Sequence, residues 1–180
     1  HACTQHLKDI KAFLEPKFEQ VAFDKEEFEV EASVIIPVRN RIKTVRDAIE
    51  SVLIQKTDFK FNIIVIDNHS TDGTTEAIEK IAEKDERLIH IIPNRDDLGI
   101  GGCWNTGVHH EKCGKFAIQL DSDDVYLLAD GLERLMAVAQ AEQPDVLLFQ
   151  AVDIYPHHQS ARKAYDTDYL ATHTSIEVFH

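Results

Sequence analysis

The chain has 180 residues, of which 43% are hydrophobic, and carries a formal net charge of −13. This length and composition predict a globular domain with a real core and argue against intrinsic disorder. The negative charge argues against a nucleic-acid surface or a basic membrane patch, so an anionic ligand would need a local cation such as a metal or an arginine. The three cysteines form no Cys-x-x-Cys pair, and their odd number favours a reducing compartment over a disulfide scaffold.

No apolar run approaches the roughly 20 residues that span a bilayer, and no signal peptide is recognisable. We therefore expect a cytoplasmic protein, and a peripheral position at the membrane stays open. The chain begins at His1 without a Met, so we expect it to be part of a longer protein.

Helices and strands are predicted to alternate after the first 31 residues. Residues 4–21 have apolar side chains at helical spacing, and we interpret residues 1–31 as a helical N-terminal extension. Short β-branched runs predict strands, and apolar stripes at helical spacing predict helices. In chain order the predictions are a strand at 33–38, a helix at 44–55, a strand at 61–67, a helix at 74–83, a strand at 88–92, a helix at 99–110 and a strand at 115–120. Asp130 is the predicted N-cap of a further helix that Pro144 stops, and a fifth strand follows at 145–152.

This alternation predicts an α/β fold with βαβ units and a mostly parallel, Rossmann-like sheet flanked by helices. Ligands of such sheets bind beyond the carboxyl ends of the strands. Three predicted strand ends are polar: PVRNR at 37–41, DNHSTDG at 67–73 and DSDD at 121–124. Because these ends share one edge of the sheet, we expect them to form one site.

The run AIQLDSDD at 117–124 places three carboxylates within four residues, directly after an apolar stretch. Crowded carboxylates repel one another, and a divalent cation would relieve that repulsion. Hard oxygen ligands suit Mg²⁺ or Mn²⁺, and Mg²⁺ sites often combine one or two carboxylates with substrate phosphates. A solvated acidic turn that caps the next helix explains the same run, and the run alone does not decide between the two.

Four segments, in this order and spacing, resemble the family 2 glycosyltransferases of the GT-A fold. They are SVIIPVRN at 33–40, VIDNHSTDGT at 65–74, the segment from Gly99 to Asn105-Thr106-Gly107, and LDSDD at 120–124. The resemblance covers about residues 32–155, which we interpret as a nucleotide-sugar-binding GT-A core. Residues 156–180 are polar and without periodicity, and we interpret them as part of an acceptor-side region or an irregular tail.

The resemblance implies a metal-dependent, inverting enzyme of polysaccharide biosynthesis. It would transfer a hexosyl or N-acetylhexosaminyl group from a nucleotide-sugar, expected to be a UDP-sugar, to an unknown acceptor. Within its nucleotide-binding segments Pro37 and Arg39 match positions that line the nucleoside, and we place Asn40 with them. Asp67 matches an Asp that accepts a hydrogen bond from the base, usually from N3–H of uracil. The alternative is a helix-capping Asp, a role that Ser70, Thr71 or Asp72 could fill just as well.

The same resemblance assigns the acidic run to a DxD motif. Asp121 matches the Asp that meets the ribose or a metal-bound water, and Asp123 matches the metal ligand, so both are assigned to a Mg²⁺ or Mn²⁺ site. Arg39, Arg41 and Arg95 are candidates to meet the diphosphate, because arginine matches phosphate geometry. The alternative is a surface cation in an acidic protein, and we favour it for Arg41.

The chain also departs from the family pattern. Asn68 stands where a second Asp is common, and Trp104 stands where an Arg is usual. The glycine-rich run from Gly99 to Gly102 is not a dinucleotide fingerprint, and we interpret it as close packing of a helix on the sheet.

No catalytic base is assigned. In the family it is an Asp or Glu downstream of the DxD motif, and Asp153, Asp166, Asp168 and Glu177 are available, but none lies in a recognisable motif. We expect the chain to hold the donor half, with part or all of the acceptor half missing. A catalytically incomplete nucleotide-sugar-binding or assembly module is therefore the alternative. A sugar nucleotidyltransferase is disfavoured, because residues 38–43 contain no glycine.

Overall fold

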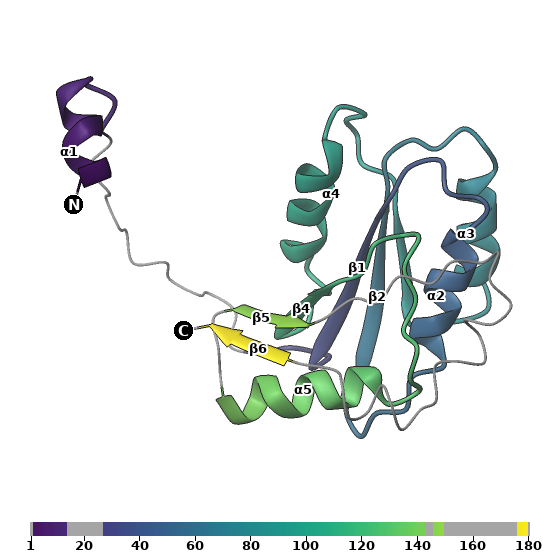
Figure 1. Cartoon of the computed structure of the whole chain (residues 1–180). Helices are drawn as coiled ribbons and strands as arrows, with labels where there is room; N and C mark the ends of the chain where they lie inside the picture. Colours follow the sequence, from purple (N-terminus) through teal and green to yellow (C-terminus); the bar gives the residue numbers. More distant parts are fainter. Residues whose placement is uncertain (1, 14–26, 143–145, 150–175, 180) are drawn as a thin grey trace, which may run out of the picture.

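A computed structural model describes residues 2–13, 27–142, 146–149 and 176–179 of the chain (Figure 1). Its central sheet has four strands, β1 (Ala32–Val38), β2 (Phe61–Asp67), β3 (Leu88–Ile91) and β4 (Phe116–Gln119). They are all parallel and lie in the order β3-β2-β1-β4. The predicted α/β class with a parallel sheet flanked by helices is confirmed.

The helices of the described residues follow the predicted order. They are α1 (Ala2–Asp9), α2 (Val45–Leu53), α3 (Thr74–Ala82), α4 (Gly99–Val108) and α5 (Gly131–Glu142). Only α1 represents the helix predicted at 4–21, because residues 14–26 lie outside the described part. Asp130 precedes α5 as predicted, but its carboxylate accepts a 2.9 Å hydrogen bond from Nε of Arg134. None of the helices in the described ranges is long and apolar enough to cross a membrane.

Alternate residues of the central strands face opposite sides of the sheet. On one side Val34, Ile36, Ile63 and Val65 pack with residues of three helices, which are Val45, Ile49 and Val52 of α2, Ile78 of α3, and Leu132 and Met136 of α5. On the other side Ile35, Ile64 and Ile66 pack with Cys103 and Trp104 of α4. Figure 1 shows the same division, with α4 on one side of the sheet and α2 and α3 on the other.

The chain order reverses beside β1. From β1 the chain proceeds to β2 and β3, and then returns through α4 to place β4 on the other side of β1. Open α/β sheets bind ligands outside the carboxyl ends of the strands at such a reversal. The carboxyl ends of β1 and β4 are therefore the expected place for a site.

Gly107 is the point of closest approach between α4 and the sheet. A Cβ atom at Gly107 would lie 2.6 Å from Cγ2 of the fully buried Ile35. At Gly101 a Cβ atom would meet nothing within 4 Å. Our interpretation that the run from Gly99 to Gly102 packs on the sheet is thus wrong, because the close contact lies two turns further along α4.

Buried polar side chains link the amino-terminal edge of the sheet. The hydroxyl of Ser33 donates to Oδ1 of Asn62 (2.5 Å) and accepts from the backbone N–H of Gly114 (2.8 Å). Nδ2 of Asn62 donates to the carbonyl of Lys112 (2.8 Å). These bonds connect β1, β2 and the α4–β4 loop, and satisfied buried polar groups favour one arrangement of the strands.

The fifth predicted strand exists but does not join the central sheet. β5 (Val146–Phe149) pairs antiparallel with β6 (Ile176–Phe179), so that Val146 lies opposite Phe179. β6 was not predicted, because its sequence neighbourhood is polar and shows no alternation. The rest of the segment predicted as a tail, up to residue 175, lies outside the described residues.

Candidate functional site: a pocket at the carboxyl edge of the sheet

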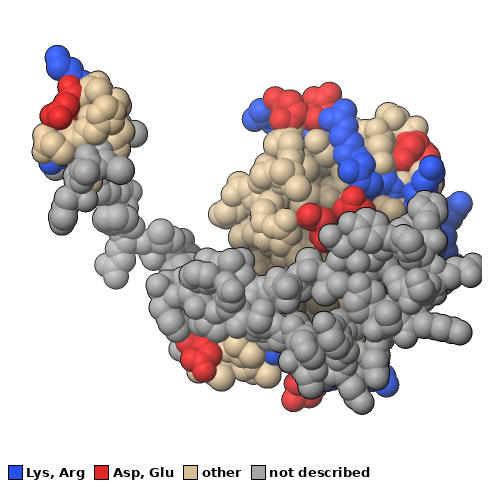
Figure 2. All heavy atoms as spheres, in the orientation of Figure 1, with Lys and Arg blue, Asp and Glu red and all other residues tan. Residues whose placement is uncertain are grey.

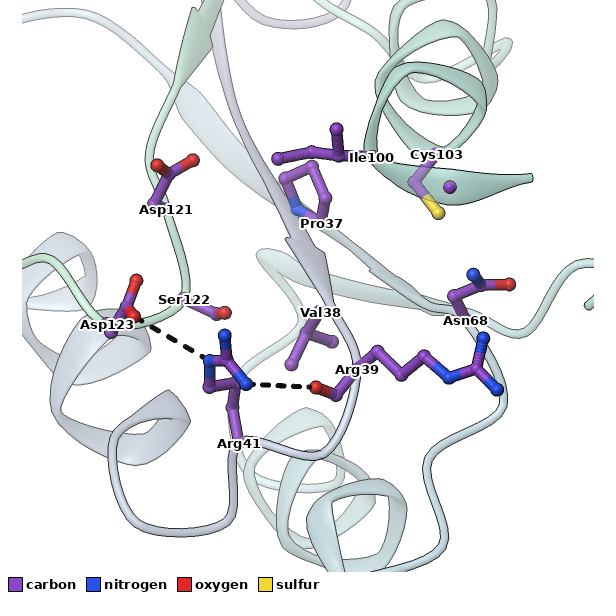
Figure 3. Close-up of a pocket in the computed structure, with 11 residues that line it drawn as sticks. Pro37, Val38, Arg39, Arg41, Asn68, Ile100, Cys103, Asp121, Ser122 and Asp123 are labelled. Carbon is purple, nitrogen blue, oxygen red and sulfur yellow. Dashed lines mark hydrogen bonds and ion pairs between the residues drawn. The ribbon is translucent and has the colours of Figure 1, made fainter. Parts of the chain in front are cut away.

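A pocket of about 420 Å³ opens at the carboxyl edge of the sheet (Figure 3). Its walls come from the end of β1, the residue after β2, the start of α4 and the loop after β4. The lining residues are Pro37, Val38, Arg39, Arg41, Asn68, Gly99, Ile100, Cys103, Asp121, Ser122 and Asp123. The three polar strand ends of the sequence thus meet in one pocket, at the chain reversal beside β1.

Four of the six site residues expected from the sequence line this pocket, namely Pro37, Arg39, Asp121 and Asp123. Asn40 and Asp67 do not line it. Both are engaged in hydrogen bonds of the loops after β1 and β2.

Asn40 joins the loop after β1 to the loop after β2. It has a positive φ of 54°, which Asn tolerates better than most residues. Its backbone N–H donates to Oγ of Ser70 (2.9 Å), and its Oδ1 accepts from the backbone N–H of Thr71 (2.8 Å). Two further bonds cross between the loops, from N–H of Arg41 to Oγ1 of Thr74 (2.9 Å) and from N–H of Ile42 to a carboxylate oxygen of Asp72 (3.2 Å).

Asp72 serves the same junction. The hydroxyl of Thr74 donates to its carboxylate, and this hydrogen bond is the main cause that lowers the pKa of Asp72 below its ordinary value. The loop after β1 is therefore hydrogen-bonded to polar groups before α3 and at its first residue. These bonds connect two of the segments that line the pocket.

Asp67 is fully buried. Its Oδ1 accepts from the backbone N–H of Ser70 (2.9 Å), and its Oδ2 accepts from the hydroxyl of Thr75 (2.5 Å) and lies 3.8 Å from Nε2 of His90. Both carboxylate oxygens thus have donors inside the protein. The structure does not bring Asp67 to the pocket where the sequence reasoning placed it, because Asp67 belongs to the side of β2 that faces α2 and α3.

Asn68 reaches the pocket instead. The two-residue alternation puts Asp67 on the face of Ile63 and Val65, and it puts Asn68 on the face of Ile64 and Ile66, which α4 covers. Asn68 is 5% exposed, and its Oδ1 has no hydrogen-bond partner in the described structure. Buried polar atoms are usually hydrogen-bonded, so this oxygen is open to a donor from a water or a ligand. The two-residue alternation of β2 would have identified Asn68 from the sequence, once the face of the sheet that carries the pocket was known.

Two carboxylates face the pocket from the loop after β4. Oδ1 of Asp121 accepts from Nε2 of Gln119 (3.0 Å), and Oδ2 of Asp123 lies 3.7 Å from Nε of Arg41. Among the described residues no three His, Cys, Asp or Glu side chains converge as a complete metal site. A half-buried Asp121 and an exposed Asp123 still fit Mg²⁺ or Mn²⁺, because such sites take their remaining ligands from substrate phosphates and water.

The arginines differ in their access to the pocket. Arg39 and Arg41 line it, and Nη1 of Arg39 donates to the carbonyl of Asp96 (3.5 Å). Arg95 does not line it, and its guanidinium makes two hydrogen bonds to the carboxylate of Asp97 (2.8 and 2.9 Å). Of the three candidates for a diphosphate contact, Arg39 and Arg41 are therefore the two in position.

The α4 wall of the pocket is apolar. α4 has no charged residue, and Figure 2 shows uncharged surface where Figure 1 places this helix. Burial is the main cause that raises the pKa of the Cys103 thiol, and the nearby Asp67 carboxylate adds to it, so Cys103 is a neutral thiol in this wall. The pocket thus has a charged side at β4 and an apolar side at α4.

Comparisons with known proteins agree with this arrangement. A family model described as Glycosyl transferase family 2 matches residues 33–177. An uncharacterized glycosyltransferase of Rickettsia felis is 41% identical over 98 residues, which are 54% of this chain and 15% of that protein. A Campylobacter jejuni protein, GalNAc(5)-diNAcBac-PP-undecaprenol beta-1,3-glucosyltransferase, is 36% identical over 108 residues, which are 59% of this chain and 34% of that protein. The chain thus spans about a third or less of the length of these relatives.

Solved structures share the fold. Crystal structures of S. aureus TarS 1-349 in complex with UDP and with UDP-GlcNAc each match 72% of this chain at 27% identity with a TM-score of 0.56, over 38% and 37% of the TarS chains. The mannosyltransferase PcManGT from Pyrobaculum calidifontis matches 77% of this chain and 39% of its own at 22% identity with a TM-score of 0.55, which shows likeness of fold. The family model covers most of the chain and the resemblance of the motifs is confirmed, so this chain belongs to glycosyltransferase family 2.

Proposed function

We propose that this chain forms the donor-binding part of an inverting glycosyltransferase that takes a sugar from a UDP-sugar with the aid of Mg²⁺ or Mn²⁺. One observation carries the proposal. The pocket combines two carboxylates on one side with Asn68, whose Oδ1 has no hydrogen-bond partner among the described residues, on the other. Arginines lie along the edge between them (Figure 3). The likeness to TarS structures that contain UDP and UDP-GlcNAc supports a uridine donor.

Asn68 is the residue that we assign to the nucleobase. A carboxamide offers an acceptor and two donor hydrogens. Uracil presents an N3–H donor beside a carbonyl acceptor, so one face of the Asn68 amide complements this edge. Asp67 keeps a supporting role behind it, because its carboxylate holds the backbone N–H of Ser70 and the hydroxyl of Thr75.

Asp121 and Asp123 are the residues that would hold the cation, and Arg39 and Arg41 are placed to bind diphosphate oxygens. When bound, the cation supplies charge neutralisation on the leaving diphosphate. Pro37, near the end of β1, lines the pocket between these groups. An acceptor hydroxyl would then attack the anomeric carbon as UDP leaves, so that the new C–O bond forms on the opposite face and the configuration inverts. The hydroxyl proton would pass to a base on the acceptor side.

A nucleotide panel tests the proposal. UDP, GDP, ADP and CDP are added to the protein with Mn²⁺ and, separately, with EDTA, and unfolding is followed by calorimetry. A ligand that binds only the native state raises its stability by about 2.7 kcal/mol at 100 times its dissociation constant. We expect UDP with Mn²⁺ to stabilise most. A higher rank for GDP would refute the base assignment, and no stabilisation by any nucleotide would refute a donor site.

Two variants assign the base contact. Asn68→Ala should lose the preference for UDP over CDP and GDP, because it removes the amide that lines the pocket. Asn94→Ala is the matched control, since Asn94 is exposed and does not line the pocket. Measurement of UDP release from a UDP-sugar then separates an active donor site from a binding or assembly module, which would bind UDP without turnover.

A further inference from the structure

Arg41 and Asp123 form an ion pair across the mouth of the pocket. Nε of Arg41 lies 3.7 Å from Oδ2 of Asp123, and Nη1 of Arg41 donates to the carbonyls of Asn40 (3.3 Å) and Arg39 (3.5 Å) (Figure 3). The guanidinium therefore lies between two backbone carbonyls and the carboxylate that the proposed function assigns to the metal. A positive group already occupies one approach to Asp123.

The backbone of Arg41 is held by short hydrogen bonds, whereas its guanidinium makes long contacts of 3.3 to 3.7 Å. Its N–H donates to Oγ1 of Thr74 (2.9 Å), and its carbonyl accepts from the N–H groups of Thr44 (3.0 Å) and Val45 (2.9 Å). The side chains of Arg41 and Asp123 are 48% and 55% exposed, so water screens their attraction. The fold thus places the guanidinium next to Asp123, but the attraction is weak enough for a stronger cation to replace it.

We infer that Arg41 is a resident counter-cation of Asp123, which a divalent cation must displace before it binds this carboxylate. A metal ion takes carboxylate oxygens at about 2.0–2.6 Å, and Nε of Arg41 lies 3.7 Å from Oδ2 of this carboxylate, so the two cations compete for it. The inference rests on the proposed metal role of Asp121 and Asp123. Its consequence is a coupling between metal and donor, because the diphosphate offers the displaced guanidinium a new anionic partner.

The expected size of the competition follows from the exposure of the pair. Ion pairs of this kind contribute little, which corresponds to about a two- to fivefold difference in metal affinity. Removal of any nearby positive charge also strengthens cation binding to some extent. A useful control must therefore remove the same charge from the same pocket without breaking this ion pair, and Arg39 provides it.

Titration of Mn²⁺ into the nucleotide-free protein, with free Mn²⁺ followed by electron paramagnetic resonance, tests the inference. Arg41→Gln should bind Mn²⁺ about two- to fivefold more tightly than wild type, and Arg39→Gln should change the affinity by clearly less. In the Asp123→Asn background, Arg41→Gln should add no more than Arg39→Gln does, because the partner of Arg41 is absent. Equal effects of Arg39→Gln and Arg41→Gln, or no effect of Arg41→Gln, would overturn the inference.

The same titration in the presence of UDP separates the inference from the proposed function. If wild type binds Mn²⁺ with UDP but Arg41→Gln shows no gain in the nucleotide-free protein, only the counter-cation role of Arg41 is refuted. If neither protein binds Mn²⁺ with or without UDP, the metal assignment of Asp121 and Asp123 is refuted, and the inference is refuted with it. Thermal melts of each variant confirm that the comparison concerns folded protein.

Discussion

The hydroxyl of Thr75 donates a 2.5 Å hydrogen bond to Oδ2 of Asp67, and this bond ties the first turn of α3 to the carboxyl end of β2. Oδ1 of the same carboxylate accepts from the backbone N–H of Ser70 (2.9 Å). The fully buried carboxylate therefore organises the loop that carries Asn68 into the pocket. Its contribution to stability and its contribution to donor binding can be measured separately.

Asp67→Asn should lower the free energy of unfolding by about 1–3 kcal/mol, because the new amide nitrogen meets donors where the carboxylate accepted. Urea unfolding measures this loss. Asp58→Asn is the control, since Asp58 is exposed, and it should change stability by less than about 0.5 kcal/mol. The folded Asp67→Asn protein should still prefer UDP. If the variant is stable but no longer prefers UDP, Asp67 and not Asn68 makes the contact with the nucleobase.

Asp123→Ala should abolish Mn²⁺-dependent binding of UDP, because one of the two carboxylates that face the pocket is lost. The metal-free protein should melt close to wild type, since the ion pair with Arg41 is half exposed and contributes at most about 1 kcal/mol. Calorimetric titration of UDP with Mn²⁺ and with EDTA measures both effects.

Asp97→Ala is the matched control for that substitution. Asp97 is also an exposed carboxylate paired with an arginine, but it lies outside the pocket lining. This variant should bind UDP and Mn²⁺ as wild type does. If Asp123→Ala binds UDP normally with Mn²⁺ and melts much lower, the acidic run is a structural cap and not a metal site.

Gly107→Ala should destabilise the protein by about 1–3 kcal/mol, because its Cβ atom would overpack a filled core. That atom would lie 2.6 Å from Cγ2 of Ile35 in β1. Gly101→Ala, in the same helix, should instead raise stability by about 0.4–1 kcal/mol, since nothing lies within 4 Å of the added methyl group. The fluorescence of Trp104, the one tryptophan of the chain, reports unfolding of both variants in urea. The same sign for the two substitutions would contradict the packing of α4.

The pH dependence of stability should contain a contribution from Asp85. Arg87 donates to its carboxylate from Nε (3.0 Å) and Nη2 (2.7 Å), and this side-chain hydrogen bonding is the main cause that lowers the pKa of Asp85. Because the pKa of Asp85 is lower in the folded state, its ionisation stabilises the protein at pH values above the unfolded-state pKa of about 3.9. This gain in stability is lost as the pH falls through the folded-state pKa.

Asp85→Asn should therefore lower the free energy of unfolding at pH 7, by about 1 kcal/mol, and match wild type at low pH. Urea unfolding between pH 7 and about pH 2 measures the difference, with Asp58→Asn as the control. A difference that stays constant over this range would show that the pairing with Arg87 does not depend on the charge of Asp85.

The sequence predicted most element positions because they depend on local patterns. β2 begins and ends where the apolar run from Phe61 to Asp67 predicted, and the helix at 74–83 is α3 (Thr74–Ala82). Apolar spacing and the turn residues between elements decide such bounds without reference to distant contacts. The partner of β5 was not predictable in this way, because β6 lies far along the chain and carries no clear alternation.

By itself, the sequence determined the α/β class, the parallel strand ends as the place of the site, and the family, since these follow from periodicity and from motifs in a fixed order. Only the tertiary structure decided which side chains the pocket receives. Asp67 and Asn68 are neighbours, yet the face of β2 that α4 covers admits only Asn68. The pairing of Arg41 with Asp123 likewise depends on β1 and β4 lying side by side, which is a long-range contact that no local pattern encodes.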